Sequence, residues 1–277
     1  MACHCGDNLK LTDLDAGQAA LPGGKADTIE ETAVQTARRE AQEEIGLPRD
    51  DKKLPSPFKI EHLCQLPTNL AFTELGVQPC VAFLHSGDSS GKELADVEES
   101  MIPRLDAREV SAVFSAPFHN LLKKTDEVAA GEEERLPGVP SDWYEGSWSM
   151  WRETRFRMHI FYVPIAGHTV TKPKSESEDK SQSQGKMAGR TRSSVDAHME
   201  EAEKAGLLTR YKVFGMTARI LVDAARVAYA EEPEFEYTQT SGDEDMIRRL
   251  MKMGRLKGER EPSAKLDRED MIKASKI

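Results

Sequence analysis

The residues best suited to chemistry are three glutamates, Glu40, Glu43 and Glu44, which stand close together in one short segment. If that segment is helical, a rotation of about 100° per residue places the three carboxylates within roughly 100° of one another, at the edge of an apolar stripe. Like charges at this spacing destabilise a helix by roughly 0.2–0.5 kcal/mol per pair. A divalent cation reverses that effect, because Mg²⁺ and Mn²⁺ prefer hard oxygen ligands. The spacing alone leaves a solvated acidic face as the alternative.

The neighbouring residues favour metal binding over a solvated face. Gly23 and Gly24 let the backbone approach a ligand closely and present N–H groups to it. Lys25 follows them and can contact a phosphate, although a solvated lysine explains it equally well. Arg39 can fix a carboxylate or a loop carbonyl through a charge-assisted hydrogen bond. We therefore predict that the three glutamates hold Mg²⁺ or Mn²⁺ beside this loop.

A helix must position these residues, and the sequence predicts one over residues 28–46. Thr28 followed by Glu31 fits a capping box at its start. Gly46 stands where helices commonly end in a left-handed residue. Ala, Val and Ile side chains between these two ends form the apolar stripe beside the glutamates.

Further elements are predicted along the chain from the period of the apolar residues. Strands are expected at Phe58–Leu66, Cys80–Leu84, Glu109–Phe114 and Phe156–Ile165, and helices at Pro117–Lys124, Phe214–Tyr229 and Met246–Met253. Residues 86–100 are expected to form a loop. Together these elements predict an α/β (α+β) fold in which a mixed β-sheet is sandwiched between helices.

Composition limits the classes of function. The net charge of −10 argues against nucleic acid as the main partner, which would need a basic surface. No apolar run approaches the roughly 20 residues of a membrane span, and the N-terminus lacks the order of a signal peptide. Cys3-His4-Cys5 has no second cluster to complete a zinc site. We expect a soluble intracellular protein with disordered polar insertions at residues 131–149 and 172–192.

Residues 39–47 match the second half of the Nudix box at every defined position, and Gly24 with the Glu30-Glu31 pair matches its first half. The chain therefore resembles the Nudix hydrolase superfamily. From Gly24 to Arg39 it is one residue longer than the usual Nudix spacing. That spacing, the Gly-Gln lead-in at residues 17–18 and the helix-like residues 213–221 resemble the coenzyme A diphosphatase branch, in particular its fungal peroxisomal members.

The resemblance implies hydrolysis of coenzyme A to 3′,5′-ADP and 4′-phosphopantetheine. It assigns Glu40 and Glu44 as the firmest metal ligands, with Glu43 as a third. Arg39 is expected to orient the site. The general base stays open between Glu40, acting through a metal-bound water, and Glu74. Two alternatives remain: another nucleotide substrate such as ADP-ribose or NADH, and a catalytically impaired nucleotide-binding module.

Histidines and tryptophans outside the box are expected to be structural. The histidines lie in strand-like runs and are interpreted as packing residues: His62, His85 and His159. The tryptophans could stack on adenine, but packing of a flap against the domain is the favoured interpretation: Trp143, Trp148 and Trp151.

The ends of the chain depart from the family pattern. Residues 1–15 are expected to be irregular, without the strands that normally precede the box, which suggests a truncated chain or a wrongly joined exon. Residues 16–237 are predicted to form the Nudix domain, and residues 238–277 a charged tail. That tail ends Ser275-Lys276-Ile277, a near match to the Ser-Lys-Leu peroxisomal address. We therefore expect import into peroxisomes through a receptor, with a cytoplasmic location as the alternative.

Overall fold

The computed structural model describes residues 2–4, 18–71, 73–85, 110–127, 143–151, 154–164, 170–171, 210–256 and 266–276. Within these ranges the side chains of residues 2–4, 18, 110–111, 151, 154 and 170–171 are not described. The predicted loop at 86–100 and the insertion at 172–192 lie outside the described residues.

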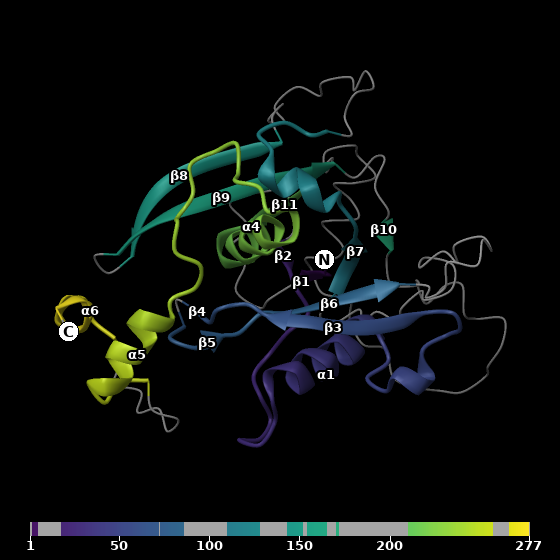
Figure 1. The fold of residues 1–277 in the computed structure, drawn as a ribbon, viewed down its shortest axis with the longest axis horizontal. Helices are drawn as coiled ribbons and strands as arrows, with labels where there is room; N and C mark the ends of the chain where they lie inside the picture. The colour runs from purple at the N-terminus through teal and green to yellow at the C-terminus, as the bar shows by residue number, and fades with distance from the viewer. Residues whose placement is uncertain are drawn as a thin grey trace, which may run out of the picture.

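A seven-stranded sheet forms the centre of the structure, in the order β10-β7-β1-β2-β11-β9-β8 (Figure 1). Its strands are β1 (Ala2–His4), β2 (Gln18–Ala20), β7 (Val110–Phe114), β8 (Tyr144–Trp151), β9 (Thr154–Pro164), β10 (Val170–Thr171) and β11 (Arg210–Phe214). Neighbouring strands run antiparallel except for β11 and β2, which are parallel and share the single register pair Lys212–Gln18. The sheet is therefore mixed, as the sequence predicts.

Two small antiparallel pairs accompany this sheet, β3 (Lys59–Gln65) with β6 (Cys80–His85), and β4 (Asn69–Leu70) with β5 (Gly76–Val77). The helices are α1 (Ala33–Ile45), α4 (Gly215–Tyr229), α5 (Glu244–Lys252) and α6 (Arg268–Ser275), with 3₁₀ turns η1 (Asp51–Lys53) and η2 (Phe118–Leu122). In Figure 1, α1 lies below β3 and β6, while α4 lies above them beside β9 and β11. The expected α/β arrangement of strands and helices is confirmed.

Helix α1 begins later than the sequence predicts. Its N-cap is Thr32, whose hydroxyl accepts a hydrogen bond from Gln35 N while the Gln35 side chain accepts one from Thr32 N. The predicted Thr28–Glu31 capping box is wrong, because the Glu31 carboxylate is bound to Arg39 instead. The predicted end is confirmed: Gly46 has a φ of 71° and donates its N–H to carbonyls of the last turn.

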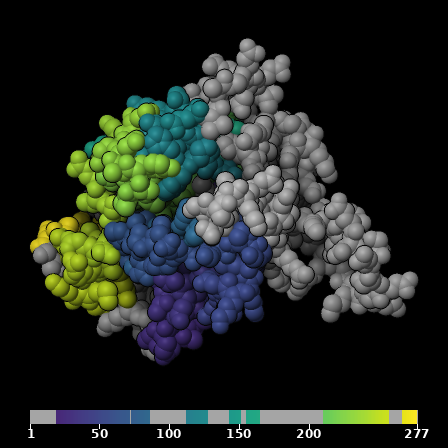
Figure 2. All heavy atoms as spheres, turned by 45° about the vertical axis from the view of Figure 1, so that its right-hand side comes forward, coloured from purple at the N-terminus to yellow at the C-terminus, as the bar shows by residue number. Residues whose placement is uncertain are grey.

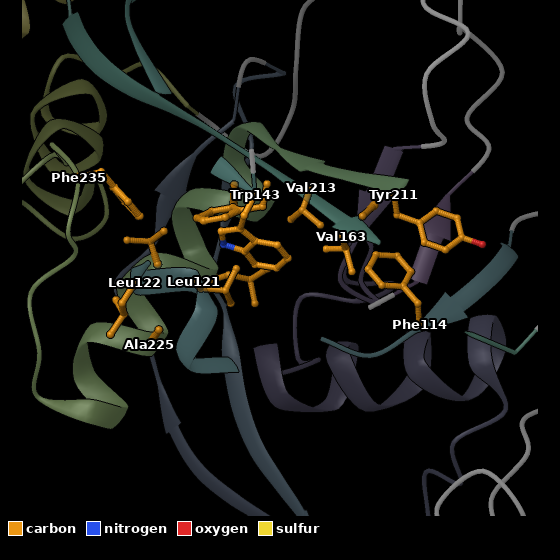
Figure 3. Packing of buried hydrophobic residues seen from close by; sticks show 14 of the residues in the cluster. Phe114, Leu121, Leu122, Trp143, Val163, Tyr211, Val213, Ala225 and Phe235 are labelled. Atoms are coloured by element: carbon orange, nitrogen blue, oxygen red, sulfur yellow. The ribbon is translucent and has the colours of Figure 1, made fainter. Parts of the chain in front are cut away.

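The main core is built around aromatic rings between the large sheet and α4 (Figure 3). Trp143 is 1% exposed and donates its indole N–H to the carbonyl of Asn120 at 2.8 Å. Phe114 stacks on Tyr211 with ring centroids 4.5 Å apart. The prediction of disorder for residues 131–149 is therefore wrong from Trp143 onward, where the chain enters β8. The described side chains of β8, residues 144–150, are exposed or only partly buried, so its composition is that of a polar segment.

The N-terminus also differs from the prediction. Ala2–His4 forms β1 and pairs antiparallel with both β2 and β7, so these three residues are not irregular. A three-residue strand is too short to show a periodic pattern, and its placement rests on backbone pairing on both edges. Residues 5–17, and the side chains of the Cys-His-Cys cluster, lie outside the described residues.

The C-terminal residues contain more structure than one helix. Helix α5 agrees with the prediction around Met246–Met253, and α6, which the sequence analysis missed, begins with a capping box between Asp267 and Asp270. Both helices contribute to a second, smaller apolar cluster with Leu70. Among the described helices, none combines the length and the apolar character that crossing a membrane requires.

Candidate metal-binding and catalytic site

Arg39 connects the glycine loop to α1. Its guanidinium donates to Glu31 at 2.9 Å and 3.3 Å and to the carbonyl of Lys25 at 2.9 Å. Asp27 lies 3.2 Å from the Arg39 Nε and donates its backbone N–H to Glu31 at 2.8 Å. These bonds, led by the one from Arg39, lower the pKa of Glu31 to about 2 and raise the pKa of Arg39. Residues 25–31 are thereby fixed to the helix that follows them.

Of the two adjacent glutamates Glu30 and Glu31, it is Glu31 that binds Arg39 and so joins the loop to the helix. The one-residue-longer spacing places Glu31, rather than Glu30, against Arg39. Asp27 was not assigned a role from the sequence. Its position beside Arg39 depends on the turn of the loop, for which the sequence carries no periodic signal.

The same guanidinium also faces the metal-ligand candidates. Arg39 Nη1 donates to Glu40 Oε1 at 2.9 Å and to Glu43 Oε2 at 3.2 Å. The Glu40 side chain is 15% exposed, whereas that of Glu43 is 58% exposed. Glu40 is therefore held on the inner side of the helix and Glu43 on its rim.

The two glycines of the loop meet two different glutamates. A Cβ at Gly24 would lie 2.1 Å from Glu40 Oε1 and 2.5 Å from its carboxyl carbon, so the Glu40 carboxylate fills the space that a side chain would need. Gly23 has room for a side chain, since the nearest atom to its Cβ position is 3.9 Å away. Its N–H points to Glu44 Oε1 at 3.4 Å, and Glu44 is only 2% exposed.

The carboxylates of Glu40, Glu43 and Glu44 are the oxygen ligands that a hard divalent cation prefers, and two of them, Glu40 and Glu44, lie against the glycine loop. A buried carboxylate such as Glu44 is costly unless charge or hydrogen bonds compensate it. Among the described residues, no three acidic, histidine or cysteine side chains are gathered closely enough to hold a metal ion. In this structure Arg39 binds Glu40 and Glu43. The residues that would hold a cation are Glu40, Glu43 and Glu44. Lys25 contributes its carbonyl to the loop, and its side chain is exposed.

Glu74, the other candidate for the general base, lies in the turn between β4 and β5 with a φ of 66°. Its carboxylate accepts a hydrogen bond of 2.7 Å from the backbone N–H of Leu266, which belongs to the C-terminal cluster. Glu74 therefore makes a structural contact with Leu266, which is distant in the sequence from the glutamates of α1.

The histidines and tryptophans occupy varied positions. His159 is buried beside Tyr144, whose hydroxyl lies 3.0 Å from His159 Nδ1, as a packing role requires. His62 is exposed on β3, and His85 stacks on Phe83 with centroids 5.2 Å apart. Trp148 is 37% exposed and donates to Glu236. The side chain of Trp151 is not described.

The fold and the glutamate helix agree with one domain family. Residues 12–135 match the NUDIX domain, so the chain carries a Nudix domain and the predicted resemblance is confirmed. Over 242 residues the chain is 26% identical to peroxisomal coenzyme A diphosphatase 1 of Saccharomyces cerevisiae. The alignment covers 84% of this chain and 65% of the yeast protein. This similarity supports a relationship of the coenzyme A diphosphatase type.

Two further relatives share shorter stretches. The Nudix hydrolase NudL of Pectobacterium atrosepticum is 46% identical over 88 residues, covering 30% of this chain and 42% of the relative. Nudix hydrolase 15, mitochondrial, of Arabidopsis thaliana is 32% identical over 123 residues, covering 44% and 36%. The chain thus spans less than two thirds of the length of each of these three relatives.

Proposed function

We propose that this chain is a metal-dependent Nudix pyrophosphatase that hydrolyses the diphosphate of coenzyme A or its derivatives to 3′,5′-ADP and (acyl-)4′-phosphopantetheine. One observation carries the proposal. The Glu40 carboxylate lies in the space left by Gly24, and the N–H of Gly23 points to the buried Glu44. Two carboxylates held against a glycine loop support a site for a cation and the diphosphate that it would bind.

Each residue has a distinct part in this mechanism. When bound, Mg²⁺ or Mn²⁺ supplies positive charge to the diphosphate and lowers the pKa of a water molecule. Glu40, Glu43 and Glu44 hold the cation. Arg39 orients Glu40 and fixes the loop through the Lys25 carbonyl. Glu40 is the better candidate for the general base, because its carboxylate lies against the glycine loop, whereas Glu74 lies in the β4–β5 turn and contacts Leu266.

The choice of coenzyme A rests on the yeast relative, whose name states that activity, and on the longer box spacing. The second candidate is a different nucleoside diphosphate derivative, such as ADP-ribose or NADH. Measuring kcat/KM for coenzyme A, acetyl-coenzyme A, ADP-ribose and NADH distinguishes the two. We expect the highest value for a coenzyme A species, and equal turnover of ADP-ribose would contradict the substrate assignment while leaving the pyrophosphatase intact.

The third candidate is a catalytically impaired binding module, and a substitution distinguishes it from an active enzyme. We expect Glu44→Gln to lower kcat/KM roughly a hundredfold or more, because it removes a ligand carboxylate. Glu30→Gln is the matched control: it makes the same chemical change at an exposed neighbour in the sequence, and full activity is expected. Mg²⁺-dependent hydrolysis that is absent in the unaltered chain, or unaffected by Glu44→Gln, would overturn the proposed enzyme.

We also propose that the protein acts in peroxisomes. The support is the similarity to the peroxisomal yeast relative and the Ser275-Lys276-Ile277 sequence. An amino-terminal fluorescent fusion should colocalise with a peroxisomal marker, and Ser275→Glu should return it to the cytoplasm. A cytoplasmic signal from both fusions would contradict this location.

A further inference from the structure

The β4–β5 hairpin (residues 67–77) is packed against the C-terminal segment (residues 242–256 and 266–276). Figure 2 shows the yellow-green C-terminal segment lying against the blue hairpin region. Leu70 of the hairpin is buried in one apolar cluster with residues of α5, α6 and the chain before α6: Leu250, Leu266, Met271 and Ala274. The two parts, more than 160 residues apart in the sequence, therefore share a core of their own.

Carboxylates of the C-terminal segment bind the backbone of the hairpin. Asp243 accepts a hydrogen bond from Leu70 N at 2.9 Å, and its own N–H donates to Thr68 O at 2.7 Å. Glu244 accepts from Thr68 N at 3.3 Å. The preceding Gly242 has a φ of 68°, and a Cβ there would lie 2.9 Å from Thr68 O, so only glycine permits this approach.

A carboxylate of the hairpin binds the C-terminal segment in return. Glu74 accepts the N–H of Leu266 at 2.7 Å, just before α6 begins. Each part thus satisfies backbone donors of the other with a charged acceptor, an arrangement worth more than a neutral hydrogen bond. Arg219 of α4 binds both Asp243 oxygens at 3.1 Å, which ties the pair to the main core.

Neither part is long enough to be stable alone. Helices α5 and α6 have nine and eight residues, below the roughly 12–15 that an isolated helix needs in water. The paired strands of the hairpin have two residues each, and an isolated two-stranded hairpin is marginal at best. Each part is therefore ordered by contacts outside itself, and the apolar cluster that the two parts share supplies such contacts.

We propose that the hairpin and the C-terminal segment form one cooperative unit, clamped by the reciprocal carboxylates of Asp243 and Glu74. This unit opens from the main core as a whole when the Arg219–Asp243 pair breaks. The clamp fixes the connection between β3 and β6, and β6 packs against α1. Hydrogen exchange resolves folding units of this kind, and the contacts that hold this one do not depend on hydrolysis of coenzyme A.

Amide hydrogen exchange on the full chain tests the clamp in two variants, Asp243→Asn and Glu74→Gln. Each should accelerate exchange roughly tenfold in both residues 67–77 and residues 266–276, the equivalent of losing a hydrogen bond to a charged acceptor. Asp245→Asn is the matched control, since Asp245 pairs with Arg248 and Arg249 within α5, and it should leave residues 67–77 unchanged.

The decisive measurement is the exchange rate in the part that does not carry the substitution. Acceleration confined to residues 67–70 in Asp243→Asn, or to residues around 266 in Glu74→Gln, would show two independent contacts and overturn the proposal. Exchange in β9 and β11 should not change in any variant. If Asp243→Asn also exposes these strands, because Arg219 loses its partner, Glu74→Gln decides the question alone, since it leaves the Arg219–Asp243 pair intact.

Discussion

Gly24 and Gly23 are adjacent in the sequence, yet their surroundings predict opposite sensitivity to substitution. Gly24→Ala places a methyl group where Glu40 Oε1 stands, so the Glu40 carboxylate must move. We expect kcat/KM to fall roughly a hundredfold, because a displacement of about 1 Å in a catalytic group has effects of that size. For Gly23→Ala, the nearest atom to the new Cβ is 3.9 Å away, so this variant should keep most of its activity. Steady-state kinetics of both variants checks this, and equal losses would contradict it.

His159 predicts how stability depends on pH. Desolvation, followed by repulsion from Arg157 and Arg219, lowers the pKa of His159 to about 4, against an ordinary value of 6.5. Below pH 6.5 the unfolded chain therefore binds a proton that the folded chain does not, and stability falls until the pH reaches about 4. The loss from this group is on the order of 3 kcal/mol.

Urea unfolding at about pH 7.5 and about pH 4.5 measures this loss. His159→Gln keeps a polar group beside Tyr144 but cannot titrate, so its stability should change less between the two pH values. A variant that loses as much stability as the unaltered chain would show that other groups dominate.

At this scale the sequence could indicate which residues matter but not what each one touches. The glutamate spacing and the glycine pair identified Glu40, Glu44 and Gly24 as residues of the candidate site. The approach of Gly24 to Glu40 and the role of Asp27 depend on loop geometry. Such geometry follows from the turn of a few residues, where no repeating pattern exists.

At the scale of the element, the start of α1 separates the sequence prediction from the structure. Thr32→Ala should destabilise the protein by about 0.5–2 kcal/mol, because its hydroxyl accepts the N–H of Gln35 at the cap. Thr28→Ala should have little effect, since Glu31 has Arg39 as its partner. Chemical denaturation of both variants measures the difference. A larger effect at Thr28 would restore the cap predicted from sequence.

Strands and helices with long apolar periods were predictable from sequence, and those placed by partners were not. The expected strand at Phe58–Leu66 and the helix at Phe214–Tyr229 agree with β3 and α4 to within one residue at each end. By contrast, α6 is mostly polar, and its buried Met271 and Ala274 gain their environment from α5 and the hairpin. Local helix propensity does not include such distant contacts, so α6 could not be predicted from it.

For the whole molecule, metal binding should appear as stabilisation. If Glu40, Glu43 and Glu44 hold a cation, Mg²⁺ at a hundred times its Kd should add about 2.7 kcal/mol to the free energy of unfolding. A thermal shift titration with Mg²⁺ and Mn²⁺, with EDTA as reference, measures this without any substrate. The shift should disappear in Glu44→Gln and persist in Glu30→Gln. A shift of equal size in all three proteins would indicate binding elsewhere.

The arrangement of the large sheet has a mechanical consequence. Among the described residues, the antiparallel strands β10-β7-β1-β2 meet the strands β11-β9-β8 through one parallel register pair, and β2 is connected to β7 through the three residues of β1. The sheet thus consists of two groups of strands that are joined by a short pairing between β2 and β11. Under a pulling force applied across the sheet, rupture should start between β11 and β2, and the strands of the long β8–β9 ladder should separate intact from the strands β10-β7-β1-β2.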